Sequence, residues 1–544
     1  YISSEEKTTK IIDINQNDKI ISATRGSDVV NISFDRFKLV IDALIQNKPI
    51  HVDTVFNSSG NDRTIIETIL CHTSHIGYMK AKTGRNKGKN KVIQYFNKWI
   101  HDTGEICDVS GEEFKSDNDD FATNEALNLS LYKPFLLLAG ISGTGKTRFI
   151  REQVKNNPDQ DNYCLVPVRP DWHEPSDLLG YISRISGKKE YVSTPVLHFI
   201  TQAWIHIFEC VGEVRADGKI GLSQKQLDHI PPFWLCLDEM NLAPVEQYFA
   251  DYLSVLETRH WYTSPELTAF NDKEGVDYGY VYQCDPLLKA DTLSQQLDEN
   301  ARTELAEKLG LDLHIALHQE IWASFCQHGI AIPFNLMVAG TVNMDETTHG
   351  FSRKVIDRAL TFDFNEFFPN DFDAYFAPTL QPKRLGYPTW SEGRAITEVS
   401  ELEQFSQKSV TFLKAVNEVL QQSPFELAYR ALNELMLALL SHHPEDNAEL
   451  VAIWDDFMMC KVLPRIEGDS DKLRSHLTAD SDLLTELEKV LAEQFAEHWE
   501  GTRPDLFNCE VAAAEEPAVP CRSKKKLAWM KERLARQCFT SFWP

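Results

Sequence analysis

A glycine-rich segment carries residues of the types that bind phosphate. Residues 140–147 read Gly-Ile-Ser-Gly-Thr-Gly-Lys-Thr and match the pattern GxxxxGK(S/T) at every fixed position. The glycines of such a loop let backbone N–H groups turn inward around phosphate oxygens, and the following helix adds partial positive charge. Lys146 is expected to reach the β and γ phosphates of a nucleotide, and the Thr147 hydroxyl to bind Mg²⁺. The predicted nucleotide-binding residues are Gly140, Ile141, Ser142, Gly143, Thr144, Gly145, Lys146, Thr147 and Arg148.

Two carboxylates follow a second apolar run. Residues 233–237 read Phe-Trp-Leu-Cys-Leu and lead directly into Asp238 and Glu239, about 90 residues after the glycine-rich segment. Asp238 is predicted to hold Mg²⁺, directly or through water, and Glu239 to orient and deprotonate the attacking water. Acidic pairs after strands are also common on protein surfaces. The position at the carboxyl end of a parallel strand, after a phosphate-binding loop, favours the catalytic interpretation.

A third apolar run ends in a polar side chain and is followed by arginines. The run ends at Asn343, which is expected to hold the hydrolytic water near the γ-phosphate. Arg353 and Arg358 lie on or near the next predicted helix. In a ring of subunits, one such arginine can reach a neighbour's γ-phosphate, an effect of about 10³–10⁵ in rate. The alternative for each arginine is an ordinary ion pair, with Asp357 or Glu346.

The elements that must position these residues form a predicted α/β core. Three apolar runs have the length of buried strands and alternate with helical patterns, which is typical of a parallel sheet. The runs lie at 134–139, 233–237 and 336–339. Because carboxyl ends of parallel strands meet at one edge, the three polar segments are expected to come together there.

The connection between the last two runs is unusually long. Residues 261–330 separate them, so we expect an insertion with structure of its own. It contains a predicted hairpin at 275–282 and a predicted helix around 296–309. Residues from about 371 to 500 are predicted to be mainly helical, and a basic helix follows at 523–534.

The first hundred residues differ in character from the rest. They predict a small α+β unit, with strands at 11–14 and 20–23 and a helix at 33–45. A basic run at 80–98 contains no acidic residue and suits contact with nucleic-acid phosphates, although a solvated loop is an equal alternative. Residues 102–120 then hold eight carboxylates against one lysine, which predicts a solvated linker.

Composition limits the classes of function. The chain has 544 residues, 55 Lys and Arg, and 81 Asp and Glu, so its net charge is −26. Attraction to DNA must therefore be local rather than general. Eleven scattered cysteines form no CxxC pair and fit no zinc-finger spacing, which favours reduced thiols. No apolar run approaches the ~20 residues of a membrane span, and no signal peptide is evident, so we expect a cytoplasmic protein.

The three polar segments, in this order, resemble the AAA+ superfamily. The resemblance is closest to the McrB family, the motor subunits of modification-dependent (type IV) restriction systems, and it covers roughly residues 130–544. The residues that carry it are 140–147, 237–249 with 253–257, 340–345 through Arg358, 168–172 with 176–181, 461–468 and the ending 540–544.

The resemblance implies a role for each site residue. Asp238 and Glu239 correspond to the Walker B pair, and Asn343 to the sensor. Arg358 corresponds to an arginine finger that acts in trans, and Arg430 to a lid arginine that reaches the nucleotide in cis. The substrate is expected to be GTP or ATP, with Mg²⁺ as cofactor.

The resemblance also implies partners and domains. It implies a homo-oligomer, expected to be a hexameric ring, with a McrC-like nuclease subunit and a DNA-reading N-terminal domain, often for modified cytosine. The best-known McrB proteins carry Asn-Thr-Ala-Asp where this chain reads Asn343-Met-Asp-Glu346, which leaves GTP against ATP open. The expected domains are an N-terminal domain at 1–103, an acidic linker at 104–128, an AAA+ core at 129–370 with its insertion at 261–330, and a helical lid and C-terminal region at 371–544.

Two other functions compete with the restriction motor. A MoxR-like AAA+ machine would remodel proteins, and a nucleotide-gated scaffold would bind without turnover. The intact acids Asp238 and Glu239 argue against the scaffold. The chain shows no PD-(D/E)xK nuclease motif, so we expect DNA cleavage by a separate subunit.

Overall fold

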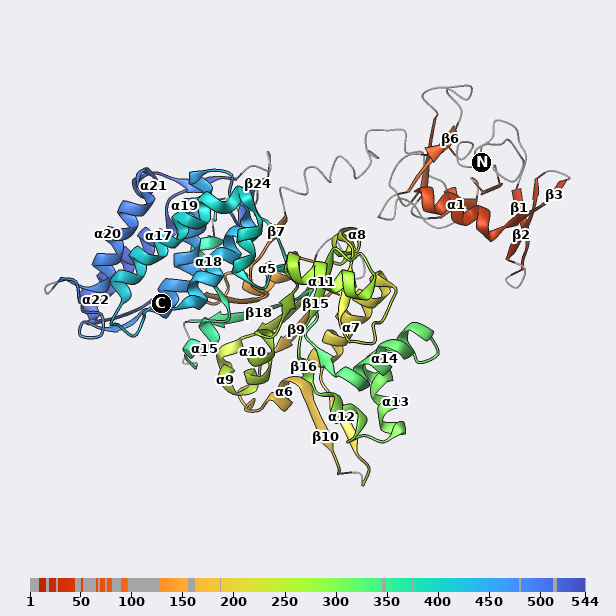
Figure 1. Ribbon diagram of the computed structural model, residues 1–544, viewed down its shortest axis with the longest axis horizontal. Coiled ribbons are helices and arrows are strands. Elements are labelled where there is room, and N and C mark those ends of the chain that lie inside the picture. Colours follow the sequence, from red (N-terminus) through yellow and green to blue (C-terminus); the bar gives the residue numbers. More distant parts are fainter. Residues whose placement is uncertain are drawn as a thin grey trace. The chain divides into compact units, whose positions relative to one another are not determined.

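The chain divides into two compact units, residues 1–126 and 127–544. The computed structural model describes parts of the first unit and most of the second (Figure 1). In the first unit these are residues 9–15, 19–25, 28–44, 50–51, 65–66, 69–73, 76–80 and 90–95. In the second they are residues 128–544 except 155–161, 186, 345–348, 371, 374–375, 377, 479–480, 512–515 and 544.

The first unit combines small antiparallel sheets with a helix. One sheet has the order β1–β2–β3 and another the order β4–β6–β5. The bounds are β1, Thr9–Asn15; β2, Ile20–Arg25; β3, Asp28–Ser33; α1, Phe34–Leu44; β4, Ile50–His51; β5, Ile76–Lys80; and β6, Asn90–Tyr95. Phe37, Val40 and Leu44 are buried on one face of α1. The two predicted strands and the predicted helix are confirmed.

The predicted DNA-contact segment and linker fall mostly outside the described residues. The basic run begins in β5 and continues through residues 81–89, which join β5 to its antiparallel partner β6. Residues 81–89 and 96–127 are outside the described part of the chain. The DNA-binding interpretation and the linker therefore stay predictions.

A parallel sheet forms the centre of the second unit. Within the described residues its five strands have the order β19–β8–β18–β13–β9, and every neighbouring pair is parallel. The strands are β8, Phe135–Gly140; β9, Tyr163–Pro167; β13, Phe233–Asp238; β18, Leu336–Asn343; and β19, Leu360–Asp363. The three predicted strands and the α/β fold class are thus confirmed.

Continuous apolar runs suit these strands because both faces of the sheet are covered. Every residue of β8 and β18 is buried, as expected for central strands of a parallel sheet. Helix α5 contacts β13 and β18, and α7 contacts β9 and β13. The short helices around the sheet are α5, Lys146–Glu152; α6, Pro175–Leu179; α7, Pro195–Val211; α8, Gln224–His229; η2, Met240–Leu242; α9, Val245–Tyr248; α10, Ala250–Leu256; α15, Arg353–Ile356; and α16, Phe364–Phe367.

The long connection between β13 and β18 has its own helices and strands. They are β14, His260–Trp261; α11, Ser264–Glu274; β15, Tyr280–Gln283; β16, Pro286–Leu288; α12, Ala290–Ser294; α13, Glu299–Lys308; α14, Ala316–His328; and β17, Ile330–Ala331. Helix α13 confirms the helix predicted around 296–309. Two further strands, β10 (Gly180–Ser183) and β11 (Glu190–Ser193), pair as a hairpin earlier in the chain.

The hairpin predicted at 275–282 is wrong. Gly275, with φ 68°, ends helix α11, and the Asn271 side chain then bonds to the backbone of Tyr278. Only the end of the segment is extended, in β15, which is the middle strand between β12 (Ile220–Leu222) and β14. The alternating pattern was real, but its partners are distant strands rather than its own first half.

The C-terminal part is mainly helical, as predicted, and its helices α17–α22 gather beside the sheet (Figure 1). Its elements, with the strand β7 that pairs with β21, are β7, Asn128–Ser130; β20, Leu380–Pro382; β21, Arg384–Gly386; η3, Gly393–Glu398; η4, Ser400–Leu402; α17, Glu403–Leu420; α18, Tyr429–His442; α19, Asn447–Phe457; η5, Met458–Val462; η6, Leu463–Arg465; β22, Glu467–Asp469; α20, Leu483–Phe495; α21, Glu497–Glu500; β23, Arg503–Pro504; β24, Asn508–Glu510; β25, Ala518–Val519; α22, Arg522–Gln537; and β26, Phe539–Ser541. Helix α22 confirms the basic helix.

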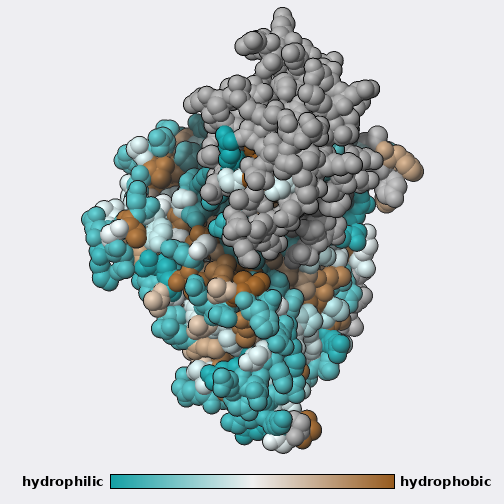
Figure 2. Space-filling view, turned by 90° about the vertical axis from the view of Figure 1, so that its right-hand side faces the viewer, coloured by the Kyte–Doolittle hydropathy of each residue, from teal (hydrophilic) through white to brown (hydrophobic). Residues whose placement is uncertain are grey.

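Hydrophilic residues cover most of the coloured surface in Figure 2, with apolar residues in smaller areas. Ile185, between β10 and β11, is the most exposed large apolar side chain among the described residues, at 94%. In the part of the chain that the structure describes, no helix combines the length and the apolar character that crossing a bilayer requires.

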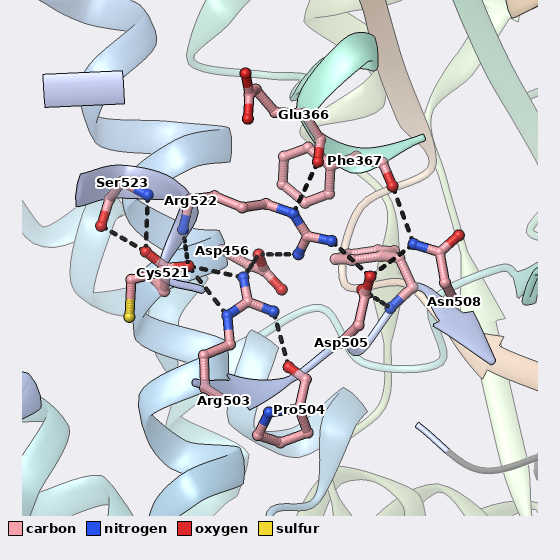
Figure 3. Close-up of polar contacts among 12 residues, drawn as sticks. Glu366, Phe367, Asp456, Arg503, Pro504, Asp505, Asn508, Cys521, Arg522 and Ser523 are labelled. Carbon is pink, nitrogen blue, oxygen red and sulfur yellow. Dashed lines mark hydrogen bonds and ion pairs between the residues drawn. The ribbon is translucent and has the colours of Figure 1, made fainter. Parts of the chain in front are cut away.

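A buried charge cluster ties three segments of the helical part together (Figure 3). Arg503 pairs with Asp455 and Asp456, at the end of α19. Arg522, the first residue of α22, pairs with Asp456 and with Asp505. Asp455 also accepts the backbone N–H groups at the start of α22, at 2.8 and 2.9 Å. Each buried charge therefore has an opposite partner, which burial requires.

Candidate active site

The glycine-rich loop connects the end of β8 to the start of α5. Gly143 and Gly145 have φ values of 82° and 91°, which side chains with a Cβ rarely adopt. The Lys146 side chain is 5% exposed, and its Nζ donates to the backbone oxygens of Gly140 at 3.0 Å and Ile141 at 2.8 Å. The loop is thus wrapped around the ammonium group of its own lysine.

The outer side of the loop is open. Ile141, Ser142 and Gly143 are exposed, and a Cβ placed on Gly143 or Gly145 would meet nothing within 4 Å. Arg148 is also exposed, and its guanidinium pairs with Glu152 one turn later at 2.8 Å. The glycines here serve backbone conformation, and the open side leaves room for a phosphate chain.

The acidic strand end meets the loop. Thr147 Oγ1 donates to Asp238 Oδ1 at 3.0 Å, and the Thr341 hydroxyl donates to the same oxygen at 2.7 Å. Mg²⁺ in nucleotide sites usually takes one or two protein oxygens, with water and phosphate supplying the rest. The adjacent hydroxyl of Thr147 and carboxylate of Asp238 therefore fit the predicted Mg²⁺ ligands.

Glu239 is held in an unusual backbone conformation. Its φ and ψ are 55° and 49°, in the left-handed region, where a residue with a side chain costs about 1–3 kcal/mol. Its backbone N–H donates to Thr341 Oγ1 at 2.9 Å, and its carboxylate accepts from Asn343 Nδ2 at 3.1 Å. The conformation turns Glu239 out of the strand direction and toward the predicted sensor.

Strand register explains why these groups converge. β18 lies between the loop strand β8 and the acidic strand β13. Asn343 is in register with Gly140 on one side, and Gly340 with Leu237 on the other. All the strands end at the same edge, so Lys146, Thr147, Asp238, Glu239 and Asn343 come together as predicted.

Arg358 lies at the opposite edge of the sheet. It precedes β19, in which Leu360 is in register with Leu136 near the start of β8. The six residues from there to the glycine-rich loop span about 20 Å at 3.3 Å per residue, more than twice the length of an arginine side chain. Arg358 therefore cannot reach the loop of its own chain.

Arg430 lies beside Arg358, not beside the chain's own loop. Both guanidinium groups pair with Glu257, which follows α10: Arg358 at 2.7 Å, and Arg430 at the other carboxylate oxygen. The resemblance predicted a contact of Arg430 with the nucleotide in cis. Such a contact would require the start of α18 to move by about the length of β8, so the geometry corrects this prediction and groups the two arginines.

The arginine pair lines a cavity of about 390 Å³. Its charged lining residues are four cations against two anions: Lys133, Arg259, Arg358 and Arg430 against Glu257 and Glu434. The excess of positive charge suits an anion. Arg353, the other candidate, donates to the backbone oxygen of Pro424 and packs over Phe425, away from this pair.

Two residues of the site were missed in the sequence. Thr341 contacts both acids, and the signal was present: it stands two residues before Asn343, so both share one face of an otherwise apolar strand. Glu257 was noted only as part of a motif. Nothing local to its sequence indicates that it pairs with arginines 101 and 173 residues away.

Comparison with known proteins gives two partial matches. Residues 389–539 match a family described as a domain of unknown function, DUF8727. The type II restriction enzyme NmeDI of Neisseria meningitidis serogroup C is 32% identical over 90 residues, which are 16% of this chain and 26% of that enzyme. The match thus spans about a quarter of the length of the curated relative. Over these segments the chain is similar to a domain without known function and to part of a restriction enzyme.

Proposed function

We propose that residues 127–544 form a P-loop NTPase of the AAA+ type, similar to the McrB family, that hydrolyses GTP or ATP. One observation carries the proposal: a loop lysine, a hydroxyl–carboxylate pair and a carboxylate–amide pair meet at one edge of a parallel sheet. These are the groups that phosphate binding, metal binding and water activation require.

Each residue has a distinct task in this proposal. Lys146 exchanges its bonds to loop carbonyls for bonds to phosphate oxygens. Glu239 accepts a proton from the attacking water, and Asn343, which already contacts that carboxylate, orients the water. Mg²⁺, held by Thr147 and Asp238, supplies charge neutralisation to the phosphates when it is bound.

The separation of Arg358 from the loop supports an assembly in which sites lie between chains. Because Arg358 and Arg430 lie at the edge away from their own loop, they suit the phosphates of a neighbouring copy. A closed ring, expected to be hexameric, would give every site an arginine pair.

The biological setting that we propose is restriction of foreign DNA. The partial similarity to a restriction enzyme supports this setting over protein remodelling. The ring would act as the regulatory or translocating motor, the N-terminal unit would bind DNA, modified or not, and a separate McrC-like nuclease would cut it.

Hydrolysis of GTP and of ATP, measured side by side, tests the activity. We expect the wild type to hydrolyse at least one, Lys146→Ala to bind it weakly, and Glu239→Gln to bind it normally without turnover, because an amide is no base. Glu304→Gln, the same chemical change at an exposed position on α13, is the control. Near-normal turnover in Glu239→Gln would contradict the assignment. Stimulation by DNA, with a candidate nuclease subunit present, tests the restriction setting.

A further inference from the structure

Two buried ammonium groups hold the backbone around Arg358. Lys461, in η5, is 6% exposed and donates from Nζ to three oxygens of this backbone at 2.8–3.3 Å: the carbonyl oxygens of Ala359, Asp357 and Ile356. Lys133, just before β8, donates to the Asp357 oxygen at 2.7 Å. Helix α15 ends at Ile356, so lysines satisfy carbonyls that no further helical turn can satisfy.

A single carboxylate joins these two lysines. Glu434, on α18, accepts from Lys133 and from Lys461, the latter at 2.9 Å. Its side chain is 4% exposed. Burial by itself raises the pKa of Glu434, but the two lysines outweigh burial and hold the pKa below its ordinary value. The charge is therefore retained, and without it two ammonium groups would face each other in a buried site.

Glu434 lies one helical turn after Arg430. The two arginines are therefore linked twice. Their guanidinium groups share Glu257, and their backbones are joined through Glu434 and Lys461. Movement of the start of α18 must move the backbone at Arg358 as well.

We propose that Glu434 is a positioning residue, which holds Arg358 and Arg430 as one unit directed at the nucleotide of a neighbouring chain. The inference rests on the proposed function, because it requires sites shared between chains. Glu434 touches no nucleotide in this arrangement. It acts by setting two backbone segments together, and a displacement of about 1 Å in such a group can cost about 10²-fold in rate.

Glu434→Gln keeps the shape of the side chain and removes its charge. We expect turnover to fall by about 10²-fold, less than the ~10³–10⁵-fold loss expected for Arg358→Ala. Nucleotide binding should be unchanged, because the loop at the other edge is intact. Lys461→Met, which removes three hydrogen bonds to carbonyls and leaves Glu434 paired with Lys133, should show the same pattern.

Mixed rings separate a positioning role from a structural one. The Glu239→Gln chain supplies normal arginines but a dead loop side, whereas the Glu434→Gln chain supplies the reverse. In a random equal mixture, about one site in four combines a normal loop side with a normal arginine side, so about a quarter of wild-type turnover should return. Mixing Glu434→Gln with Arg358→Ala should restore nothing, because both defects lie on the same side.

The controls separate failure of this inference from failure of the proposed function. Asp505→Asn also removes a buried carboxylate charge in the helical part, away from the arginines, and should keep turnover near wild type. If Arg358→Ala and Glu239→Gln fail to complement, shared sites are wrong and the proposed function fails in that respect. If they complement but neither Glu434→Gln nor Lys461→Met complements Glu239→Gln, Glu434 is only structural and the inference is overturned. Equal loss in Asp505→Asn would also overturn it.

Discussion

Removing the hydroxyl of Thr341 should disable the acid pair without touching it. This hydroxyl accepts the backbone N–H of Glu239 at 2.9 Å and donates to Asp238 at 2.7 Å. Thr341 is 2% exposed, so water cannot easily replace these two bonds. Thr341→Val changes the hydroxyl to a methyl group of similar size and leaves the strand packing in place.

The expected magnitude follows from the two bonds. A hydrogen bond to a charged group contributes about 1.5–3 kcal/mol, and a buried donor left without an acceptor costs about 1–3 kcal/mol. Asp238 keeps its bond to Thr147, so we expect a loss of about 2–4 kcal/mol of unfolding free energy. Glu239 also loses the hydrogen bond that holds its left-handed backbone. A loss of about 1.4–2.7 kcal/mol in transition-state stabilisation would lower turnover by about 10–100-fold.

Thr361 provides a matched control on the same sheet. It is buried in β19, and its hydroxyl has no hydrogen-bond partner among the described residues. Thr361→Val should therefore be neutral or stabilise by up to about 1 kcal/mol, with normal turnover. Thermal unfolding and steady-state hydrolysis are compared for Thr341→Val, Thr341→Ser and Thr361→Val. If Thr341→Val matches Thr361→Val in turnover, the hydroxyl does not orient the acids and the reasoning is refuted.

Three further predictions concern pH, stability and DNA. Burial raises the folded-state pKa of Asp456 to about 6, so its contribution to stability is lost as pH rises from about 4 through 6; Asp456→Asn should flatten this interval in pH-dependent denaturation, whereas Asp455→Asn, which breaks five hydrogen bonds, should cost about 3–5 kcal/mol at neutral pH. Burial lowers the folded-state pKa of Lys133 to about 7, so the unfolded chain binds the extra proton above pH 7 and unfolding free energy should rise with pH from about 7 toward 10; the rise should be smaller in Lys133→Met, and an equal rise would contradict the cause. In DNA titrations of the whole chain, with modified and unmodified duplexes, neutralising four residues should reduce the log–log salt slope by up to ~0.9 for each phosphate that they neutralise, without changing basal hydrolysis, and an unchanged slope would show that the basic run is a solvated loop: Lys82, Arg85, Lys87 and Lys89.

Local patterns in the sequence determined the elements and the identity of most site residues. The loop at 140–147 is recognisable because its glycines and lysine act within eight consecutive residues. Apolar runs with polar ends predicted β8, β13 and β18, because strands buried on both faces are apolar along their whole length. Parallel pairing then required their ends to converge.

The same local patterns misjudged residues whose partners are remote. The segment 275–282 alternates like a hairpin, yet β15 pairs with strands that lie before it in the chain, one of them nearly 60 residues earlier. Periodicity shows that a strand has two different faces. It does not show which other strand covers its edges.

Only the tertiary structure decided how the arginines and the acids are held. Glu257, Arg358 and Arg430 come from three segments that are far apart in the sequence, and the chain's strand order puts them at the edge opposite the loop. Thr341 reaches Asp238 and Glu239 because β18 is the neighbour of β13. Each residue's chemistry is local and readable from the sequence, whereas distances between residues a hundred positions apart depend on strand order and register, which only the packed chain defines.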